Sequence, residues 1–488
     1  MRWITSLSFV LVVGCAQPAT PEIQPEMRVV HEAVEALGGR SAVDSVRTLT
    51  AEGTGEYFFL GQNRSPDSEQ QMFEIKSFQR ITDLAHERLR HEQVLEPRFL
   101  GTFPSSFTNV IGLDGDVAFE DDRGNIYREA PSVARDRRVE LRHTAVGILQ
   151  TALAKGSVVS NLRHNGVHPS VDVRTADGSV FTLTVDGTTR LPIKVASKGD
   201  QANLGDVMME TDFGAYQPAG AMKLPTRVAF RLDGHPVLNL RVTKNTVNGP
   251  TPDLSAPPAA KAEPADPAPK VTAEPLAKGV WLLGGESHHS VLVEFSDHAV
   301  LIEAPLSDAR AFAVLSKAAE LLPAKPVTHL VNTHHHFDHS AGVRAAVSRG
   351  LTIVAHEKSR RFLEAMMERP HTVAPDALAK KPMRMQLQGV EGRTVHQDGT
   401  RTMEIYATGG THADTMLVVY LPKDRLLVEV DDYVPRPPQG TPRPNPFAAS
   451  LFAAVASRKL DVERVVPLHG RIASFAEFEA TVRSEKAQ

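Results

Sequence analysis

The chain has 488 residues, and 54 lysines and arginines against 58 aspartates and glutamates give it a formal net charge of −4. At about 150 residues per domain, this length predicts two or three domains. A content of 41% hydrophobic and 23% charged residues excludes a largely disordered chain and a bundle of membrane spans. The weakly acidic balance argues against a nucleic-acid partner, which requires a basic surface. Two counts are unusual, namely 20 histidines and a single cysteine, Cys15.

A short apolar segment, residues 3–13, follows Arg2 and ends just before Cys15. A run of about 11 apolar residues is too short to span a bilayer but fits the core of a signal peptide. The sequence Val12-Val13-Gly14-Cys15 resembles a bacterial lipobox, which implies that Cys15 is lipidated and becomes the mature N-terminus. We therefore expect a lipoprotein signal peptide over residues 1–15 and a tether over residues 16–26. Simple cleavage a few residues later and a small buried cysteine stay open as alternatives.

The lipobox resemblance also implies a location. An acylated cysteine would anchor the exported protein to a membrane of the cell envelope. Ala16 follows the cysteine, where many lipoproteins of the inner membrane have an aspartate. We therefore expect the outer membrane, on the side that faces the periplasm.

Residues 27–248 are expected to form one helix followed by a mostly antiparallel sheet. Apolar residues at 29, 30, 33, 34 and 37 lie on one helical face, and Gly38-Gly39 ends the helix. Alternating runs such as 181–185 and 237–242 are separated by Asp-Gly pairs, which favour hairpin turns. Residues 132–154 are expected to form a helix on this sheet. The segment 223–227 and the pattern around it resemble bacterial lipoprotein-localisation carriers, which implies a curved half-barrel and an apolar ligand or a protein partner.

A proline-rich segment separates this domain from the rest of the chain. Between residues 249 and 275 there are eight prolines, interleaved with alanine and single charges and without an aromatic residue. Such a composition does not form a core, so we expect an extended, semi-stiff linker.

Residues 276–488 change to alternating strands and helices. Residues 291–295 and 299–302 predict paired strands, and Ser307 begins a helix with an apolar face. A buried strand follows over 327–331, then a helix over 341–349 and another strand over 351–355. Sites in such folds usually form where strands end. Thirteen of the 20 histidines occur in this segment, so a metal site is expected here.

The clearest chemical pattern directly follows the buried strand 327–331. It reads Thr333-His334-His335-His336-Phe337-Asp338-His339 and leads into a helix. In an extended segment, residues two apart point the same way, so His334 and His336 can bind one cation. Asp338 and His339 can face a second cation nearby. Imidazole and carboxylate are the ligands of catalytic zinc.

The motif resembles the HxHxDH signature of metallo-β-lactamase-fold hydrolases, and later segments resemble that superfamily in the same order. These are Gly409-Gly410-Thr411-His412, the strand that ends at Asp431, and Val465-Val466-Pro467-Leu468-His469. The resemblance covers residues 276–475 and implies an αββα sandwich. It also implies two divalent cations, most naturally Zn²⁺, although iron and manganese accept the same donors. The first cation would be held by His334, His336 and His412, the second by Asp338, His339 and His469, with Asp431 as a bridge. Asp432 is the alternative bridging residue.

This resemblance implies a hydrolase for a small-molecule substrate. A hydroxide shared by two cations would attack an ester, lactone, thioester or β-lactam carbonyl, and Asp338 would orient it and carry a proton. The short segment between His412 and Asp431 leaves no room for the insertion of nucleic-acid-cleaving members. Two alternatives stay open: a sulfur dioxygenase of the same fold with one iron, and a non-enzymatic lipoprotein with a structural metal site.

Several other residues are weaker candidates. His288 and His289 precede a strand at the expected mouth of the site, Asp414 could hydrogen-bond a ligand histidine, and Tyr433 could form a wall of the cleft together with residues 435–446. His335 is expected to lie behind the ligands or to face solvent. The remaining histidines of this segment have no motif around them and are expected to be ordinary residues: His298, His329, His356, His371 and His396.

Overall fold

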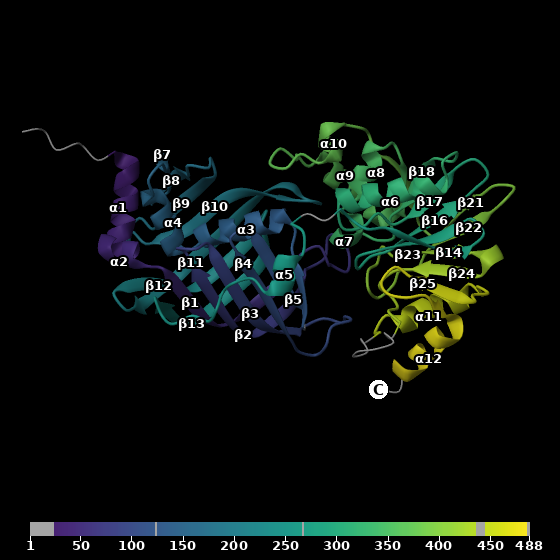
Figure 1. The fold of residues 1–488 in the computed structure, drawn as a ribbon, viewed down its shortest axis with the longest axis horizontal. Coiled ribbons are helices and arrows are strands. Elements are labelled where there is room, and N and C mark those ends of the chain that lie inside the picture. Colours follow the sequence, from purple (N-terminus) through teal and green to yellow (C-terminus); the bar gives the residue numbers. More distant parts are fainter. Residues whose placement is uncertain (1–23, 123, 266–267, 436–444, 486–488) are drawn as a thin grey trace, which may run out of the picture.

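The computed structural model describes residues 24–122, 124–265, 268–435 and 445–485, which form two domains side by side (Figure 1). The expected signal peptide with Cys15, and most of the expected tether, lie outside the described residues. The first domain is built on one large antiparallel sheet and the second on two sheets with helices outside them. Both parts of the expected fold class are therefore confirmed.

The sheet of the first domain has 13 strands, and every neighbouring pair is antiparallel. Their order is β6-β5-β4-β3-β2-β1-β13-β12-β11-β10-β9-β8-β7, so the first and the last strand pair in the middle, with Leu49 opposite Val247. The strands are β1 Thr48–Phe59, β2 Gln71–Asp83, β3 Arg88–Pro97, β4 Phe107–Asp114, β5 Val117–Asp122, β6 Asn125–Arg128, β7 Val158–Asn165, β8 His168–Arg174, β9 Val180–Val185, β10 Pro192–Gln201, β11 Gly205–Ala219, β12 Met222–Leu232 and β13 His235–Val247.

Four helices accompany this sheet: α1 Pro25–Leu37, α2 Arg40–Ser45, α3 Pro131–Arg142 and α4 Ala145–Leu153. The expected apolar face of α1 is buried in a core with α4 and strands β8–β10. The single helix expected over 132–154 is two helices. The chain turns extended at Thr144, whose Oγ1 accepts a hydrogen bond from the Gly147 N–H and so begins α4. Among the described residues, no helix is both long and apolar enough to cross a membrane.

The proline-rich segment is not a free spacer. It contains a short helix, α5 Pro258–Ala262, and Ala256 and Ala260 are buried against Phe119 of β5. The backbone N–H of Arg128 donates to Glu263 Oε2 at 2.9 Å. Small alanine side chains between the prolines fit against the sheet edge, so this stretch lies along the first domain. The first strand of the second domain already begins at Thr272, inside the expected linker.

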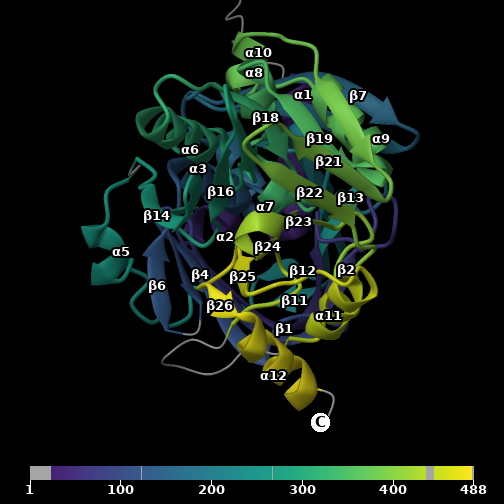
Figure 2. The ribbon, with the colours of Figure 1, turned by 90° about the vertical axis from the view of Figure 1, so that its right-hand side faces the viewer.

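The second domain has four layers, helix–sheet–sheet–helix (Figure 2). One apolar core lies between the two sheets, another between the first sheet and helices α6 and α8, and a third between the second sheet and helices α11 and α12. The first sheet is β14 Thr272–Ala277, β15 Val280–Gly284, β16 Ser290–Glu294, β17 Ala299–Ile302, β18 Val327–Val331, β19 Thr352–His356 and β20 Gln386–Val390. The second is β21 Arg393–Gln397, β22 Thr402–Ala407, β23 Leu417–Leu421, β24 Leu426–Glu429, β25 Arg464–Pro467 and β26 Ala473–Ser474.

The helices of this domain are α6 Asp308–Leu321, α7 Phe337–Ser340, α8 Val343–Ser348, α9 Arg360–Glu368, α10 Ala377–Lys380, α11 Ala448–Ser457 and α12 Phe475–Glu485. Two short 3₁₀ turns, Glu357–Ser359 and Pro422–Asp424, complete it. Helix α7 lies on the side of the second domain that faces the first domain (Figure 1). The helix expected over 341–349 is the shorter α8, preceded by α7.

Two histidines of the first domain, His91 and His143, are buried, and His143 forms two hydrogen bonds to strands of the sheet. Burial lowers the pKa of His91 to about 3 and that of His143 to about 4. The His143 ring hydrogen-bonds through Nδ1 to Thr211 Oγ1 at 3.0 Å and through Nε2 to Ser197 Oγ at 2.8 Å. Both rings are therefore neutral in the folded protein at pH values where the unfolded chain already binds a proton.

We expect the free energy of unfolding to fall as the pH is lowered from 6.5 to 4. Over this range the unfolded chain binds protons that buried His143 does not, which costs about 1.4 kcal/mol per pH unit and per histidine. Urea unfolding of wild type and His143→Gln at several pH values measures the slope. The free energy of unfolding of His143→Gln should change less steeply with pH than that of the control His164→Gln, which replaces an exposed histidine. Equal slopes for the two variants would show that His143 is protonated in the folded protein.

Candidate metal centre

The histidine motif begins where β18 ends and runs in an extended conformation into α7. The rings of His334 and His336 lie on one side, with their centroids 4.5 Å apart. The ring of His335 points the other way, where it is buried and hydrogen-bonds through Nδ1 to Thr415 Oγ1 at 2.7 Å. The alternation of an extended chain therefore places two of the three rings together. His335 lies behind them and does not face solvent.

A first group of four side chains comes together from three segments of the second domain: His334, His336, His412 and Asp431. His412 Nε2 is 3.0 Å from His336 Nδ1 and 3.2 Å from Asp431 Oδ2. His334 Nε2 is 3.3 Å from the same carboxylate oxygen. The structure thus gathers every residue expected around the first cation, with Asp431 beside them.

A second group lies next to the first and consists of His288, Asp338, His339 and His469. His469 Nε2 is 3.3 Å from His339 Nε2, and His339 Nε2 is 3.7 Å from Asp338 Oδ2. His288 Nε2 donates to Asp338 Oδ2 at 3.2 Å. The three residues expected around the second cation are therefore together. His288, a weaker candidate from the sequence, joins them.

The Asp431 carboxylate lies between the two groups. Its Oδ2 is 3.1 Å from His339 Nε2, and its Oδ1 is 2.9 Å from His469 Nε2, while Oδ2 also faces the first group. Asp431 has a φ of 60°, in the left-handed region that non-glycine residues rarely adopt. Such strain persists where the surroundings fix the backbone, and it is common at functional sites. The neighbouring Asp432 belongs to neither group, and both of its oxygens are buried without a hydrogen-bond partner among the described residues.

The donor atoms fit the spacing that a cation requires. Four ligands at about 2.0–2.2 Å in a tetrahedron are about 3.3–3.6 Å apart, close to the distances between neighbouring donors in both groups. His334 Nε2 is buried, has no hydrogen-bond partner among the described residues and is aimed at Asp431. Burial lowers the pKa of His334 to about 3, so its ring is neutral and offers a lone pair. These residues could hold two divalent cations of the kind that histidine and carboxylate bind.

Charge within the two groups is unevenly distributed. Burial opposes a charge on His339, but the carboxylates of Asp431 and Asp338 outweigh it and raise the pKa of His339 well above its ordinary value. Burial also opposes a charge on Asp431, and here His469 and His339 hold the pKa well below its usual range. The centre of the site is therefore a carboxylate that needs positive charge on both sides.

Glu303 supports the site from behind and was not expected from the sequence. This buried carboxylate accepts hydrogen bonds through Oε1 from the Thr333 N–H at 2.7 Å and from Thr333 Oγ1 at 2.6 Å. Its Oε2 accepts from His339 Nδ1 at 3.3 Å. The proton on Nδ1 leaves Nε2 of His339 free for a cation. A carboxylate that accepts a hydrogen bond from the far nitrogen commonly orients a metal-binding histidine in this way.

The loop between β1 and β2 of the first domain reaches into the metal centre. Gln62 Nε2 donates to Asp338 Oδ1 at 2.7 Å, and His336 Nε2 donates to the Asn63 carbonyl at 2.8 Å. The second bond places the proton of His336 on Nε2 and leaves Nδ1 for the first group. The Phe337 N–H also donates to the Gly61 carbonyl at 3.2 Å. The first domain thus positions one expected ligand and the expected proton carrier.

A second contact between the domains lies beside α7. Asn203 Nδ2 donates to Ser340 Oγ at 2.7 Å, and the Asp206 N–H donates to the Pro370 carbonyl at 2.7 Å. The Asp206 carboxylate accepts from the Thr372 and Val373 N–H groups at 2.7 and 2.9 Å. The turn between β10 and β11 therefore fixes the domains at a second point.

Two of the weaker candidates, Tyr433 and Asp414, lie elsewhere than expected, whereas His289 lies near the expected place. Tyr433 is fully buried and packs on Phe478 at 4.8 Å, so it belongs to the core and does not form a cleft wall. Asp414 pairs with Lys358 at 3.1 Å, and its other oxygen has no partner, so it does not hydrogen-bond a ligand histidine. His289 Nε2 donates to the Gly470 carbonyl at 3.1 Å and lies beside the metal centre. Of the expected cleft wall 435–446, residues 436–444 lie outside the described residues.

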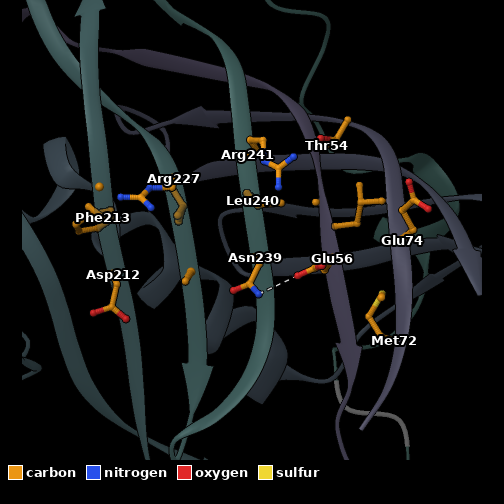
Figure 3. Close-up of a pocket in the computed structure, with 15 residues that line it drawn as sticks. Thr54, Glu56, Met72, Glu74, Asp212, Phe213, Arg227, Asn239, Leu240 and Arg241 are labelled. Atoms are coloured by element: carbon orange, nitrogen blue, oxygen red, sulfur yellow. Dashed lines mark hydrogen bonds between the residues drawn. The ribbon is translucent and has the colours of Figure 1, made fainter. Parts of the chain in front are cut away.

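The first domain has a separate hollow of about 610 Å³ (Figure 3). Polar and charged side chains from β1, β2, β11, β12 and β13 surround it, and Asn239 Nδ2 donates to Glu56 Oε2 at 3.1 Å. Its carboxylates Glu56, Glu74 and Asp212 occur with the guanidinium groups of Arg227 and Arg241. None of the residues that line it belongs to the motif, so the hollow is distinct from the metal centre.

The chain matches the family model described as the metallo-beta-lactamase superfamily over residues 283–469. Residues 283–469 are a metallo-beta-lactamase superfamily domain. The match begins in β15, before His288, and ends at His469, so it includes both groups of metal-binding side chains. The resemblance expected from the motif is therefore confirmed for this part of the chain.

Solved structures of metallo-beta-lactamases are similar to a part of the chain. The DIM-1 enzyme exposed to ceftazidime is 20% identical, covers 46% of this chain and 100% of its own, and has a TM-score of 0.35. The enzyme from Hirschia baltica is 20% identical, with coverages of 44% and 96% and a TM-score of 0.33. FIM-1 from Pseudomonas aeruginosa in its mono-zinc form is 20% identical, with coverages of 44% and 95% and a TM-score of 0.33. No curated protein matches the chain.

Replacement of Asp431 distinguishes it from Asp432 as the bridging residue of the superfamily domain. We expect Asp431→Ala to weaken zinc binding at least tenfold, because its carboxylate contacts both groups. Asp432→Asn should keep the wild-type zinc content, since burial raises the pKa of Asp432 to about 7 and its oxygens contact no ligand. Metal content after dialysis, measured by mass spectrometry, checks both. Loss of zinc in Asp432→Asn alone would assign the bridge to Asp432.

Replacement of Gly61 tests whether the β1–β2 loop is fixed on the superfamily domain. Gly61 has a φ of 79°, and a Cβ atom added there would overlap the ring of Phe337. Gly234 has a φ of 81° with open space around it, so Gly234→Ala is a control with the same backbone strain. We expect Gly61→Ala to lower the free energy of unfolding by about 1–3 kcal/mol more than the control, the usual cost of overpacking. Equal losses in urea unfolding would show that the loop does not dock.

Proposed function

We propose that the protein is a metal-dependent hydrolase that uses two divalent cations, most naturally Zn²⁺, to cleave an ester, lactone, thioester or β-lactam bond in a small molecule. The observation that carries this proposal is the position of the Asp431 carboxylate, between two groups of histidine ligands. The superfamily match supports a hydrolase but leaves the bond open, because one fold hosts many activities. Iron and manganese would suit the same donors.

When bound, the two cations would lower the pKa of a water towards neutrality and withdraw charge from the substrate carbonyl. Asp338 is the residue placed to accept the proton of the attacking water and to return it to the leaving group. Its two oxygens are held separately, Oδ1 by Gln62 Nε2 at 2.7 Å and Oδ2 by His288 Nε2 at 3.2 Å. Both donors fix the orientation of the carboxylate, so Gln62 and His288 act as positioning residues.

The number of ligands favours a hydrolase over a dioxygenase with one iron. Two adjacent groups of four side chains are available, and Asp431 faces both, which is more than a single iron requires. A structural role for the metal alone is disfavoured by Asp338, which pairs with no lysine or arginine of the described residues and is reached by side chains of both domains.

The first domain offers a cavity for a second ligand. A cavity of about 240 Å³ lies between its sheet and helices α3 and α4, and most of its lining is apolar, with His143 and Thr211 on one side. This cavity supports an apolar ligand for the first domain. Lipidation of Cys15 would place the whole protein at the outer membrane, facing the periplasm, a proposal that rests on the sequence around the cysteine.

A hydrolysis screen tests the proposal. Zinc-loaded protein should cleave at least one substrate of a panel with an ester, a lactone, a thioester and a β-lactam, while oxygen uptake stays at background. We expect Asp338→Asn to lower kcat by about 10²–10⁴-fold, the usual contribution of a group that moves a proton.

The matched control is Asp461→Asn, which alters an exposed carboxylate on the surface of the same domain. This variant should keep wild-type rates. Oxygen consumption together with one iron per chain would contradict the hydrolase proposal and support the dioxygenase. Equal rates for Asp338→Asn and wild type would show that Asp338 does not take part in the reaction.

A further inference from the structure

Three histidines outside the metal centre come together at another place in the second domain. His298 precedes β17, His329 lies in β18 and His396 lies in β21. A nitrogen of each ring lies within 4.8 Å of the other two. Each of the three occurs without a motif around it, so their positions in the sequence do not connect them. Only the folding of three distant segments gathers them.

The rings are close enough to share a cation. His298 Nε2 and His396 Nε2 are 2.7 Å apart, and the ring centroids of His329 and His396 are 4.8 Å apart. At this distance the two nitrogens form an N–H···N hydrogen bond, in which one ring donates and the other accepts. The donors of a tetrahedral cation are about 3.3–3.6 Å apart, so a cation between these rings replaces the shared proton and requires the two nitrogens to separate by about 0.6 Å or more. A shared proton involves two rings only and gives the third ring no role.

The outward nitrogens are held by oxygen atoms. His298 Nδ1 donates to Asp297 Oδ1 at 2.7 Å, and His329 Nδ1 lies 2.8 Å from Thr328 Oγ1. A proton on Nδ1 leaves the lone pair on Nε2, directed into the cluster. This is the arrangement that orients metal-binding histidines, with an oxygen acceptor behind the ring.

The surroundings suit a bound cation. Phe295 is buried beneath the cluster, stacked on His298 at 5.0 Å and edge-on to His396 at 4.7 Å. Asp297 and Asp398 supply negative charge nearby, and Asp398 Oδ2 accepts from the Ser296 N–H at 2.6 Å. The ammonium group of Lys325 pairs with Glu294 at 2.7 Å and donates to the Phe295 carbonyl at 2.8 Å, so both of these contacts are to oxygen atoms outside the three rings.

We propose that His298, His329 and His396 form a third metal site, which binds a divalent transition ion such as Zn²⁺ independently of the centre around Asp431. Three imidazoles and a water fill a tetrahedral shell, and imidazole donors favour Zn²⁺, Co²⁺, Ni²⁺ and Cu²⁺ over Mg²⁺ and Ca²⁺. The partial exposure of all three rings leaves a path for the ion and the water.

The third site is separate from the metal centre. Strands β17 and β18 are parallel, and His298 lies before β17 whereas the motif follows β18. The two sites are therefore at opposite ends of these strands. The third site connects the two sheets, because β17 and β18 belong to the first and β21 to the second. An ion there would stabilise the packing of the two sheets. This effect on stability does not depend on the proposed hydrolase activity.

Metal content of the full chain tests the proposal. Protein stripped with a chelator, reloaded with Zn²⁺ and passed through gel filtration should hold one equivalent more in wild type than in His396→Gln. His298→Gln and His329→Gln should lose the same equivalent. The control His164→Gln, at an exposed histidine of the first domain, should lose none. Equal zinc content in wild type and all three variants would overturn the third site.

A direct observation guards against variants that fail to fold. In crystals of wild type grown with Zn²⁺, anomalous scattering at the zinc edge should give a peak between the three rings, apart from any peak at Asp431. A peak at Asp431 without one between these rings would overturn the proposal. The zinc-induced rise in the unfolding midpoint should also be smaller in His396→Gln than in His164→Gln, and an equal rise would count against the site.

Discussion

The structure of the metal centre depends on one carboxylate. Asp431 occupies a left-handed backbone conformation at the end of β24, and four histidines from three separate segments direct a nitrogen at its two oxygens. A buried carboxylate is costly unless positive charge surrounds it. The two sheets, the loop after β18 and the loop after β25 are all arranged so that this charge is available. The sandwich is the scaffold that brings these segments to one edge.

Much of the second domain was predictable because its signals are local. Strand, loop and helix follow in order around His334–His339, and the alternation of an extended chain separates His335 from its neighbours. Asp431 was distinguishable from Asp432 because the strand before it fixes which side chain faces inward. The helix expected over 132–154 was not predictable in detail, since the break at Thr144 depends on one hydrogen bond to Gly147.

The remaining features depend on contacts between segments far apart in the chain. Gln62 and Asn63 lie more than 270 residues from the side chains that they contact, and nothing in their own sequence marks them. The cluster of His298, His329 and His396 has the same origin. Asp414 shows the opposite case, because a residue close to His412 in sequence is drawn away by Lys358. Sequence spacing identifies ligands within one loop, whereas partners from another domain require the fold.

The hydrogen bond from His336 to the Asn63 carbonyl has a consequence for where the protein can be divided. A fragment that begins after the proline-rich segment would contain every histidine and aspartate of both groups around Asp431. It would lack the acceptor that fixes the proton of His336 and the amide that holds Asp338. The first domain therefore helps to position the candidate metal centre, although none of its described residues belongs to the two groups. Both domains are therefore needed to hold His336 and Asp338 in the observed arrangement, although both of these residues belong to the second domain.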